Sequence, residues 1–231
     1  MTIDQLPTAD AEQLQPVDAL LMRRHEATLA TLGLPLSDIV LLIRDDVPAV
    51  ANAFAQRFTN ARIHVLGARR PLTAPESAQL HRRVTYRYAA SERDRLNYLR
   101  KIPRPQAIVE AGNRKRVHKL SCFKEFLFFV QPSGAYIVDE LDSTHHPKYD
   151  DEQGQNLVDL LTELARADAV HPMRSQDASR MIHELSGAIE SITFSGRTAI
   201  IRRSGQSYFL KLRDWEADPV LTSHFGDRWG E

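Results

Sequence analysis

The chain has 231 residues, of which 42% are hydrophobic and 26% charged, and its 30 basic and 30 acidic residues give a formal net charge of zero. This composition is that of an ordinary globular domain and excludes disordered, collagen-like and disulfide-rich chains. The one cysteine, Cys122, cannot form an internal disulfide, and no apolar stretch approaches the roughly 18–20 residues of a membrane span. Because no export signal is recognisable at the N-terminus, we expect a cytoplasmic protein without a membrane span.

The first half of the chain alternates helical and strand patterns. Residues 1–35 carry apolar side chains at helical spacing, which predicts an N-terminal helical segment. Asp38–Ile43 is a nearly continuous apolar run, typical of a parallel strand covered on both faces. Helical spacing returns over Pro48–Phe58, and strands are expected at Ile63–Leu66 and near Thr85–Tyr88. The order of these elements is that of an α/β domain.

The second half continues the alternation and then ends differently. Ala135–Val138 is rich in β-branched and aromatic residues and predicts a buried strand. Near the C-terminus, the turn Ser195-Gly196-Arg197 predicts a β-hairpin. The remaining predicted elements are helices over Arg93–Arg100, Lys119–Val130, Leu157–Leu164 and Ala178–Leu185, a strand at Ala107–Val109, hairpin strands at Ile189–Phe194 and Thr198–Arg202, and a mobile loop over 142–156.

Together these elements predict an α/β fold, a three-layer Rossmann-like sandwich with a mostly parallel sheet and a C-terminal antiparallel hairpin. We place the α/β domain at residues 36–212, after the N-terminal helical segment 1–35 and before a C-terminal tail, 213–231. The tail carries Trp215, Phe225 and Trp229. Aromatic residues of this kind are enriched at interfaces, so the tail either docks onto a partner or wraps its own domain.

Charge is segregated along the chain. His81–Lys124 holds thirteen lysines and arginines against three acids, a net charge of +10, and Glu125–Glu190 has a net charge of −9. Such asymmetry can mark a nucleic-acid or phosphate surface, but runs of charge are usually solvated faces. Because the basic stretch contains no recognisable nucleic-acid motif, we do not expect a nucleic-acid partner.

The stretch from Ala107 to Thr144 resembles the second half of class I methyltransferases related to the macrocin and mycinamicin sugar O-methyltransferases. In that family a strand ends in D-D-G-S-H, a helix of the S-F-x-x-L-F type follows, and a P-G-G-x-Y-x-x-E-D-L strand comes next. Here the match is most specific from Cys122 to Leu141. The resemblance implies the methyltransferase fold, a bound S-adenosylmethionine and transfer of its methyl group to a hydroxyl.

The N-terminal half departs from that family at each place where the donor is expected to bind. No glycine follows the first strand before Gly67, and the second strand runs into Ala68 without the acid that would hold the ribose. Ala89 stands where an adenine-side acid is expected, and Arg114 replaces the family's histidine base. Arginine stays protonated and cannot accept the hydroxyl proton. The joint loss predicts degenerate cofactor motifs, and no residue is assigned to cofactor binding.

An acidic edge remains at the predicted carboxyl ends of the strands. Under the resemblance, Glu110, Asp139 and Glu140 are the candidate catalytic residues, and Glu110, Asp139 and Asp142 are candidate ligands of Mg²⁺, which prefers oxygen donors. The alternative is that Asp139 and Glu140 are loop-end acids paired with arginines of the basic segment. Cys122 lies among apolar residues and is expected in the core.

Two hypotheses follow from the sequence. In the first, a methyltransferase-fold protein has lost S-adenosylmethionine binding, needs no cofactor and acts as a non-catalytic binding or scaffolding module. It would have a protein partner or a sugar-like acceptor, or form an oligomer, within a natural-product or glycan pathway. In the second, a diverged S-adenosylmethionine-dependent O-methyltransferase, with or without Mg²⁺, acts on a sugar or natural-product hydroxyl. Nucleic-acid binding is a third, weaker option, which a steep loss of affinity with added salt would reveal.

Overall fold

The computed structural model describes residues 30, 36–43, 47–67, 70–111, 116–145, 156–167 and 185–205. The predicted C-terminal tail and all but one residue of the N-terminal helical segment lie outside these ranges. The helix predicted over Ala178–Leu185 also lies outside them except for its last residue. The described ranges fall almost entirely within the predicted α/β domain.

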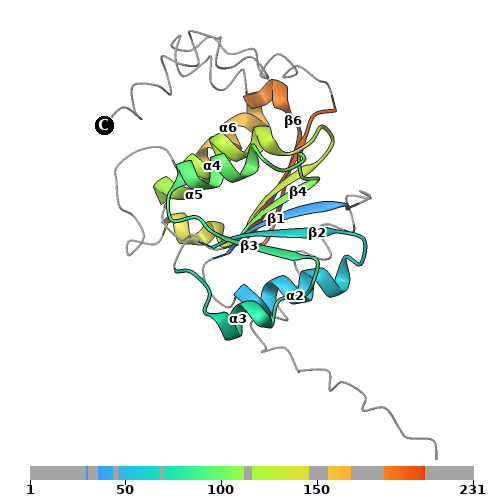
Figure 1. Cartoon of the computed structure of the whole chain (residues 1–231). Coiled ribbons are helices and arrows are strands. Elements are labelled where there is room, and N and C mark those ends of the chain that lie inside the picture. The colour runs from blue at the N-terminus through green and yellow to red at the C-terminus, as the bar shows by residue number, and fades with distance from the viewer. Residues whose placement is uncertain are drawn as a thin grey trace, which may run out of the picture.

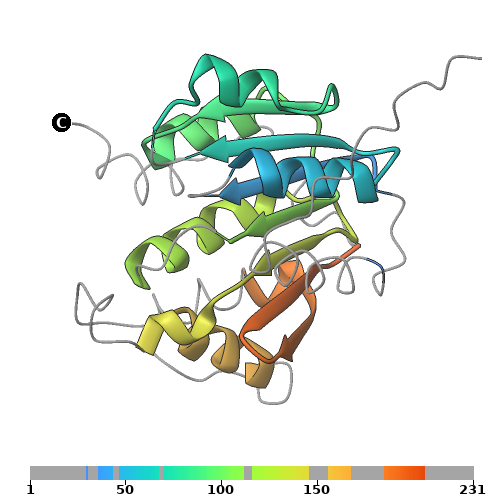
Figure 2. The ribbon, with the colours of Figure 1, turned by 90° about the horizontal axis from the view of Figure 1, so that it is seen from below.

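The described residues form a seven-stranded sheet with the strand order β3-β2-β1-β4-β5-β7-β6. Strands β1 to β5 are parallel, β7 is antiparallel to β5, and β6 pairs with β7 as a hairpin. The two edge strands, β3 and β6, lie at opposite ends of the sheet (Figure 2). The strands are β1 (Asp38–Ile43), β2 (Arg62–Gly67), β3 (Val84–Tyr88), β4 (Ala107–Glu110), β5 (Ala135–Val138), β6 (Ile189–Ser195) and β7 (Thr198–Arg203).

Helices cover the sheet in layers. α2 and α3 lie on one face and α4, α5 and α6 on the other (Figure 1), which gives the three-layer arrangement predicted from the sequence. The helices are α2 (Val47–Arg57), α3 (Ala74–Ala78), α4 (Glu92–Leu99), α5 (Arg116–Phe126) and α6 (Leu157–Ala167), with 3₁₀ turns η1 (Leu127–Phe129) and η2 (Leu141–His145).

The sheet divides the core into two parts because successive side chains of a strand point to opposite faces. In β1, Ile39 and Leu41 pack into the cluster beneath α2, whereas Val40 and Leu42 pack into the cluster beneath α4, α5 and α6. All four side chains are buried. This double burial explains why β1 has a continuous apolar sequence and not an alternating one.

The sequence predicted most element positions correctly and missed some details. β1 and β5 have the predicted bounds. The aromatic helix begins earlier than predicted, and its last turn is the 3₁₀ turn η1, followed by Val130. The Arg203 guanidinium donates hydrogen bonds to the carbonyl groups of Phe128 and Val130, which satisfies backbone acceptors at this helix end.

Short elements supported by local capping escaped prediction. Thr73 and Glu76 form a capping box at the start of α3, and Arg70 forms an ion pair with Glu76. The predicted loop over 142–156 instead begins within η2, while residues 146–155 lie outside the described ranges. Both differences involve elements of five residues, too short for a hydrophobic period to identify.

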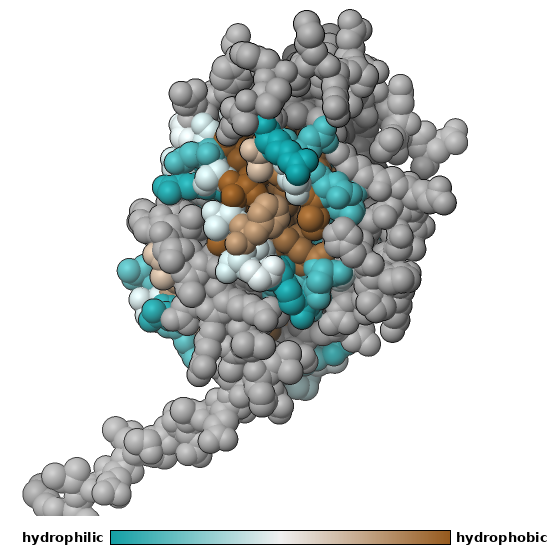
Figure 3. All heavy atoms as spheres, turned by 180° about the vertical axis from the view of Figure 1, so that it is seen from behind, coloured by the Kyte–Doolittle hydropathy of each residue, from teal (hydrophilic) through white to brown (hydrophobic). Residues whose placement is uncertain are grey.

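The side of the molecule opposite to the view of Figure 1 shows hydrophobic side chains gathered at its centre, with hydrophilic residues around them (Figure 3). No helix in the described part of the chain is long and apolar enough to cross a membrane.

Close packing around Gly134, just before β5, gives a first prediction. A Cβ atom at this position would lie 2.5 Å from the backbone oxygen of Gln106 and 2.6 Å from Cγ1 of Val130. We expect Gly134→Ala to lower the free energy of unfolding by about 1–3 kcal/mol, the usual range for overpacking. Urea denaturation measures this change. Gly187→Ala is the matched control, since nothing lies within 4 Å of its added Cβ, and an equal loss in both variants would contradict the packing argument.

Candidate functional site

The candidate site lies at the carboxyl edge of the sheet. β1 pairs with β2 on one side and with β4 on the other, so the strand order reverses here. Ligands of open α/β sheets bind beyond the carboxyl ends of the strands at such a switch point. The ends of β4 and β5 are joined by a hydrogen bond of 3.0 Å from the Asp139 amide to the Glu110 carbonyl oxygen. The predicted acidic residues therefore do come together at one edge.

Glu110, the last residue of β4, points into the protein. Its side chain is 1% exposed, and its Oε2 accepts a hydrogen bond of 2.7 Å from the Tyr136 hydroxyl. Its other oxygen, Oε1, is buried without a hydrogen-bond partner in the described structure. Burial raises the pKa of Glu110, while the Lys119 charge and the Tyr136 hydrogen bond act in the opposite direction. Its second oxygen atom is thus desolvated, and the carboxyl is a poor ligand for a molecule outside the protein.

Asp139, the first residue after β5, is also 1% exposed. Its Oδ1 accepts a hydrogen bond of 2.9 Å from the Thr198 hydroxyl at the start of β7. Its backbone oxygen accepts a hydrogen bond of 2.5 Å from the Lys119 ammonium. Asp139 consequently links β5 to both the C-terminal hairpin and α5.

Lys119, on the first turn of α5, is a buried basic residue at this edge that sequence reasoning missed. The side chain is 1% exposed, although lysine is almost never fully buried unless it is paired. Burial lowers the pKa of Lys119, and the charges of nearby acids oppose that change. These acids are Glu110, Glu140, Asp139 and Asp142.

Glu140 and Asp142 lie farther out than Glu110 and Asp139. Glu140 adopts a left-handed backbone conformation with φ of 54°, which turns the chain from β5 into η2. Arg197, in the turn of the C-terminal hairpin, lies 3.7 Å from Oε1 of Glu140 and donates a hydrogen bond of 2.9 Å to Asp142. The acidic edge thus has a cationic partner in Arg197 of the hairpin. The sequence analysis had instead named arginines of the basic segment, His81–Lys124, as the alternative partners.

The predicted ligands of Mg²⁺ do not form a coordination site among the described residues. No group of three or more His, Cys, Asp or Glu side chains is placed there to hold a metal ion. Glu110, Asp139 and Asp142 each already accept a hydrogen bond, from Tyr136, Thr198 and Arg197 respectively. Since Mg²⁺ needs several oxygen ligands in near-octahedral geometry, the residues as they stand do not fit it.

The side chain of Tyr86, from β3, packs against Gly67 at the end of β2, where the resemblance implies a carboxylate for the ribose. A Cβ on Gly67 would lie 2.5 Å from the hydroxyl oxygen of Tyr86 and 2.7 Å from its ring atom Cε2. The same hydroxyl donates a hydrogen bond of 2.7 Å to the Arg70 carbonyl oxygen. Tyr86 therefore joins β3 to Arg70, and any side chain at position 67 would have to displace the Tyr86 ring or hydroxyl.

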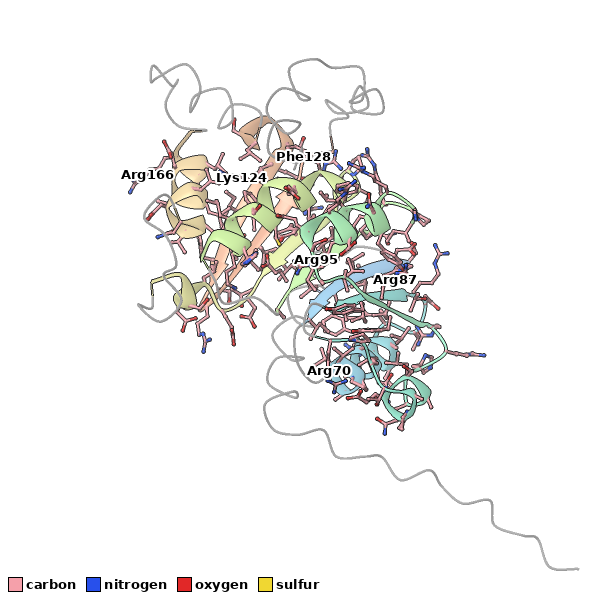
Figure 4. The ribbon with its side chains drawn as sticks, turned by 60° about the vertical axis from the view of Figure 1, so that its left-hand side comes forward. Arg70, Arg87, Arg95, Lys124, Phe128 and Arg166 are labelled. Carbon is pink, nitrogen blue, oxygen red and sulfur yellow. The ribbon has the colours of Figure 1, made fainter. Side chains whose placement is uncertain are left out.

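Several residues of the basic segment are turned inward. Arg83 caps the end of α2 through hydrogen bonds to the carbonyl oxygens of Phe58 and Ala61. Arg95 points from α4 into the protein, whereas Arg166 projects outward from α6 (Figure 4). Arg95 is 8% exposed and donates to Sγ of Cys122 at 3.5 Å. Part of the positive charge counted in the sequence is therefore used inside the domain.

Cys122 behaves as the sequence predicted. Cys122 is a buried free cysteine whose thiol pKa is raised well above its usual value, chiefly by burial. It is a core residue, as expected. His118 is exposed near the start of α5. Arg114, the predicted replacement of the family's base, lies outside the described residues.

Comparison with known proteins identifies the fold. No family model and no curated protein matches the sequence. The structure is similar to MycE, a methyltransferase from the mycinamycin biosynthetic pathway, in complex with Mg, SAH and mycinamycin VI, with a TM-score of 0.62 at 13% identity. A crystal form of MycE with Mg and SAH gives a TM-score of 0.61 at 12% identity.

The chain has the class I methyltransferase fold. The first of these alignments covers 80% of this chain and 48% of MycE, and the second covers 87% and 54%. The chain thus spans about half the length of MycE. The methyltransferase fold and its antiparallel hairpin confirm the architecture predicted from the Ala107–Thr144 resemblance.

Glu125 on α5 and Glu92 on α4 form a pair of interacting carboxyl groups. Burial and the neighbouring charge of Glu92 raise the pKa of Glu125 to about 8. Each residue has a buried carboxyl oxygen without a hydrogen-bond partner in the described structure. The two carboxyl groups therefore destabilise each other when both are ionised.

This pair predicts how stability depends on pH. Glu125 has a higher pKa in the folded state than its usual 4.5, so the folded protein holds a proton that the unfolded chain releases. Stability falls as pH rises from about 4.5 to about 8 through this group. We expect Glu125→Gln to be more stable than the wild type at pH 8 and to lose this part of the decline. Denaturation at several pH values tests it, and identical pH profiles would contradict the prediction.

Proposed function

We propose that this chain is a methyltransferase-fold protein that has lost S-adenosylmethionine binding and acts as a non-catalytic binding or scaffolding module. The observation that carries the proposal is the position of Tyr86 against Gly67. A donor in this fold needs a hydrogen-bond acceptor for its ribose at the end of the second strand. Here that position has no side chain, and its Cβ space is filled by a tyrosine that stabilises the protein itself.

The surrounding sequence supports the same proposal. No acid that could replace the missing one stands at the end of β2 or directly after it. The residues there are Leu66, Gly67, Ala68, Arg69 and Arg70. After β3, Ala89 is 1% exposed and has only a methyl group to offer. Binding of ribose and adenine depends on hydrogen bonds to the protein. Without acceptors after β2 and β3, the site lacks most of the hydrogen bonds that would favour a bound nucleoside over water.

The acidic edge supports binding better than catalysis. Glu110 and Asp139, two of the three candidate catalytic residues, are buried and hydrogen-bonded to neighbouring side chains. A general base must reach the proton of its substrate, and a carboxyl that is 1% exposed does not. Among the described residues of the edge, Arg197 and Asp142 are the more accessible, at 46% and 56% side-chain exposure. Their charges suit a polar partner surface or a sugar-like ligand.

The second candidate function is a diverged S-adenosylmethionine-dependent O-methyltransferase that acts on a sugar or natural-product hydroxyl. Its support is the likeness of the fold to MycE, whose structures contain Mg and SAH. In this case the donor would have to be held by contacts other than those of the β2 carboxyl end.

Calorimetric titration distinguishes the two functions. We expect no saturable heat with S-adenosylmethionine or S-adenosylhomocysteine at ligand concentrations up to about 1 mM, which corresponds to binding weaker than about −4 kcal/mol. The positive control is an active methyltransferase of the same fold under the same buffer conditions. A micromolar dissociation constant for either ligand would refute the loss of donor binding and favour the second function.

A further inference from the structure

The edge strand β6 is open on one side. It pairs with β7 and ends the seven-stranded sheet, so in the described part of the chain no second strand lies beside it. Its side chains are accessible as well. Ser191, Thr193 and Ser195 are exposed, and Phe194 is 44% exposed. An open strand edge is a template for pairing with another strand.

β6 lacks the usual protection of an open edge. Proteins often place lysine, proline or unpaired charges on such strands. β6 contains neither lysine nor proline, and its one charged residue, Glu190, forms an ion pair with Arg202 of β7. An irregularity in the pairing with β7 between Ile189 and Ser191 confines the regular part to the second half of the strand. The segment Ser191–Ser195 is therefore an uncharged and regular edge.

This edge also offers apolar side chains. The hairpin lies at the lower end of the sheet in Figure 2, which is the side turned away in Figure 1 and drawn in Figure 3. Hydrophobic side chains gather on that side between hydrophilic ones. Ile192 and Phe194 share one face of β6, because they lie opposite the core residues Ile201 and Ala199 of β7. Ile192 packs against the core, and Phe194 remains open to a partner.

We propose that β6 pairs with β6 of a second copy of this chain, antiparallel about a two-fold axis at Thr193. In this register Thr193 faces its own counterpart. Ile192 faces Phe194 of the second copy, and Phe194 faces Ile192. Ser191 and Ser195 face each other at both ends. Aromatic with β-branched and hydroxyl with hydroxyl are pairs that stabilise antiparallel strands, and no like charges lie opposite each other.

Charge selects this register and limits the assembly to two copies. An axis at Ile192 would instead place Phe194 opposite the Glu190 carboxylate of the second copy and desolvate that charge. Pairing about a two-fold axis uses β6 of both chains, so the contact closes. The opposite edge strand, β3, carries the exposed Arg87, a charge that opposes further strand addition. The inference goes beyond the proposed function, because it holds whether or not the chain binds a methyl donor.

Sedimentation velocity of the full chain tests the dimer. We expect the mean mass to rise from that of one chain toward that of two between about 1 and 200 µM, a range that brackets a micromolar dissociation constant. Thr193→Lys sets two ammonium groups opposite each other and should weaken dimerisation at least about tenfold. Thr85→Lys is the matched control, since it places the same charge on an exposed threonine of β3, and it should leave dimerisation unchanged.

Disulfide cross-linking tests the register. Opposite residues of antiparallel strands have Cα atoms about 4.5–5.5 Å apart, which a disulfide can bridge. Oxidised Thr193→Cys should therefore form a covalent dimer. Ser191→Cys should not, because the two copies of position 191 would lie about 13 Å apart along the strands. The native Cys122 is buried, so it does not compete in this reaction.

Three results would overturn the proposal. The first is the mass of one chain at every concentration. The second is a dimer that Thr193→Lys leaves intact, or that Thr85→Lys weakens equally. The third is equal cross-linking through positions 191 and 193. Thr193 is exposed, so its variants are expected to fold, and cross-linking of Thr193→Cys still decides the question if Thr193→Lys does not.

Discussion

The buried contact between Lys119 and the end of β5 is the interaction on which the carboxyl edge depends. The Lys119 side chain is 1% exposed, and its Nζ donates a hydrogen bond of 2.5 Å to the Asp139 carbonyl oxygen, which supplies the polar partner that burial requires. This hydrogen bond joins the first turn of α5 to the end of β5, just before η2.

A second constraint acts at the end of β2. Tyr86 fills the space beside Gly67, and its hydroxyl holds the Arg70 carbonyl oxygen. At both places a group that the fold could use for a ligand is instead engaged in contacts within the chain. The contacts at the end of β5 and at the end of β2 have the same physical basis. A buried polar group needs a partner whether or not a ligand supplies it.

The methyltransferase fold and the chemistry of its edge are consequently separate matters. The chain shares its fold with MycE at only 13% identity, because a sheet covered on both faces requires apolar strands but few particular residues. The site is more demanding, since hydrogen-bond donors, acceptors and charges must lie within a few ångströms of one another. Sequence divergence can therefore preserve the fold and remove the site.

The sequence by itself determined the order and approximate bounds of β1, α2, β2, α4, β4, β5 and the hairpin, because hydrophobic period and turn residues are local signals. It also placed Glu110, Asp139, Glu140 and Asp142 at one edge, since parallel strands end on the same side. Only the tertiary structure decided what these acids contact. Lys119 is 20 residues from Asp139 and Thr198 is 59 residues from it, so no local pattern predicts their meeting. Partner choice in a buried site depends on packing across the whole domain, and that information is not contained in any one segment.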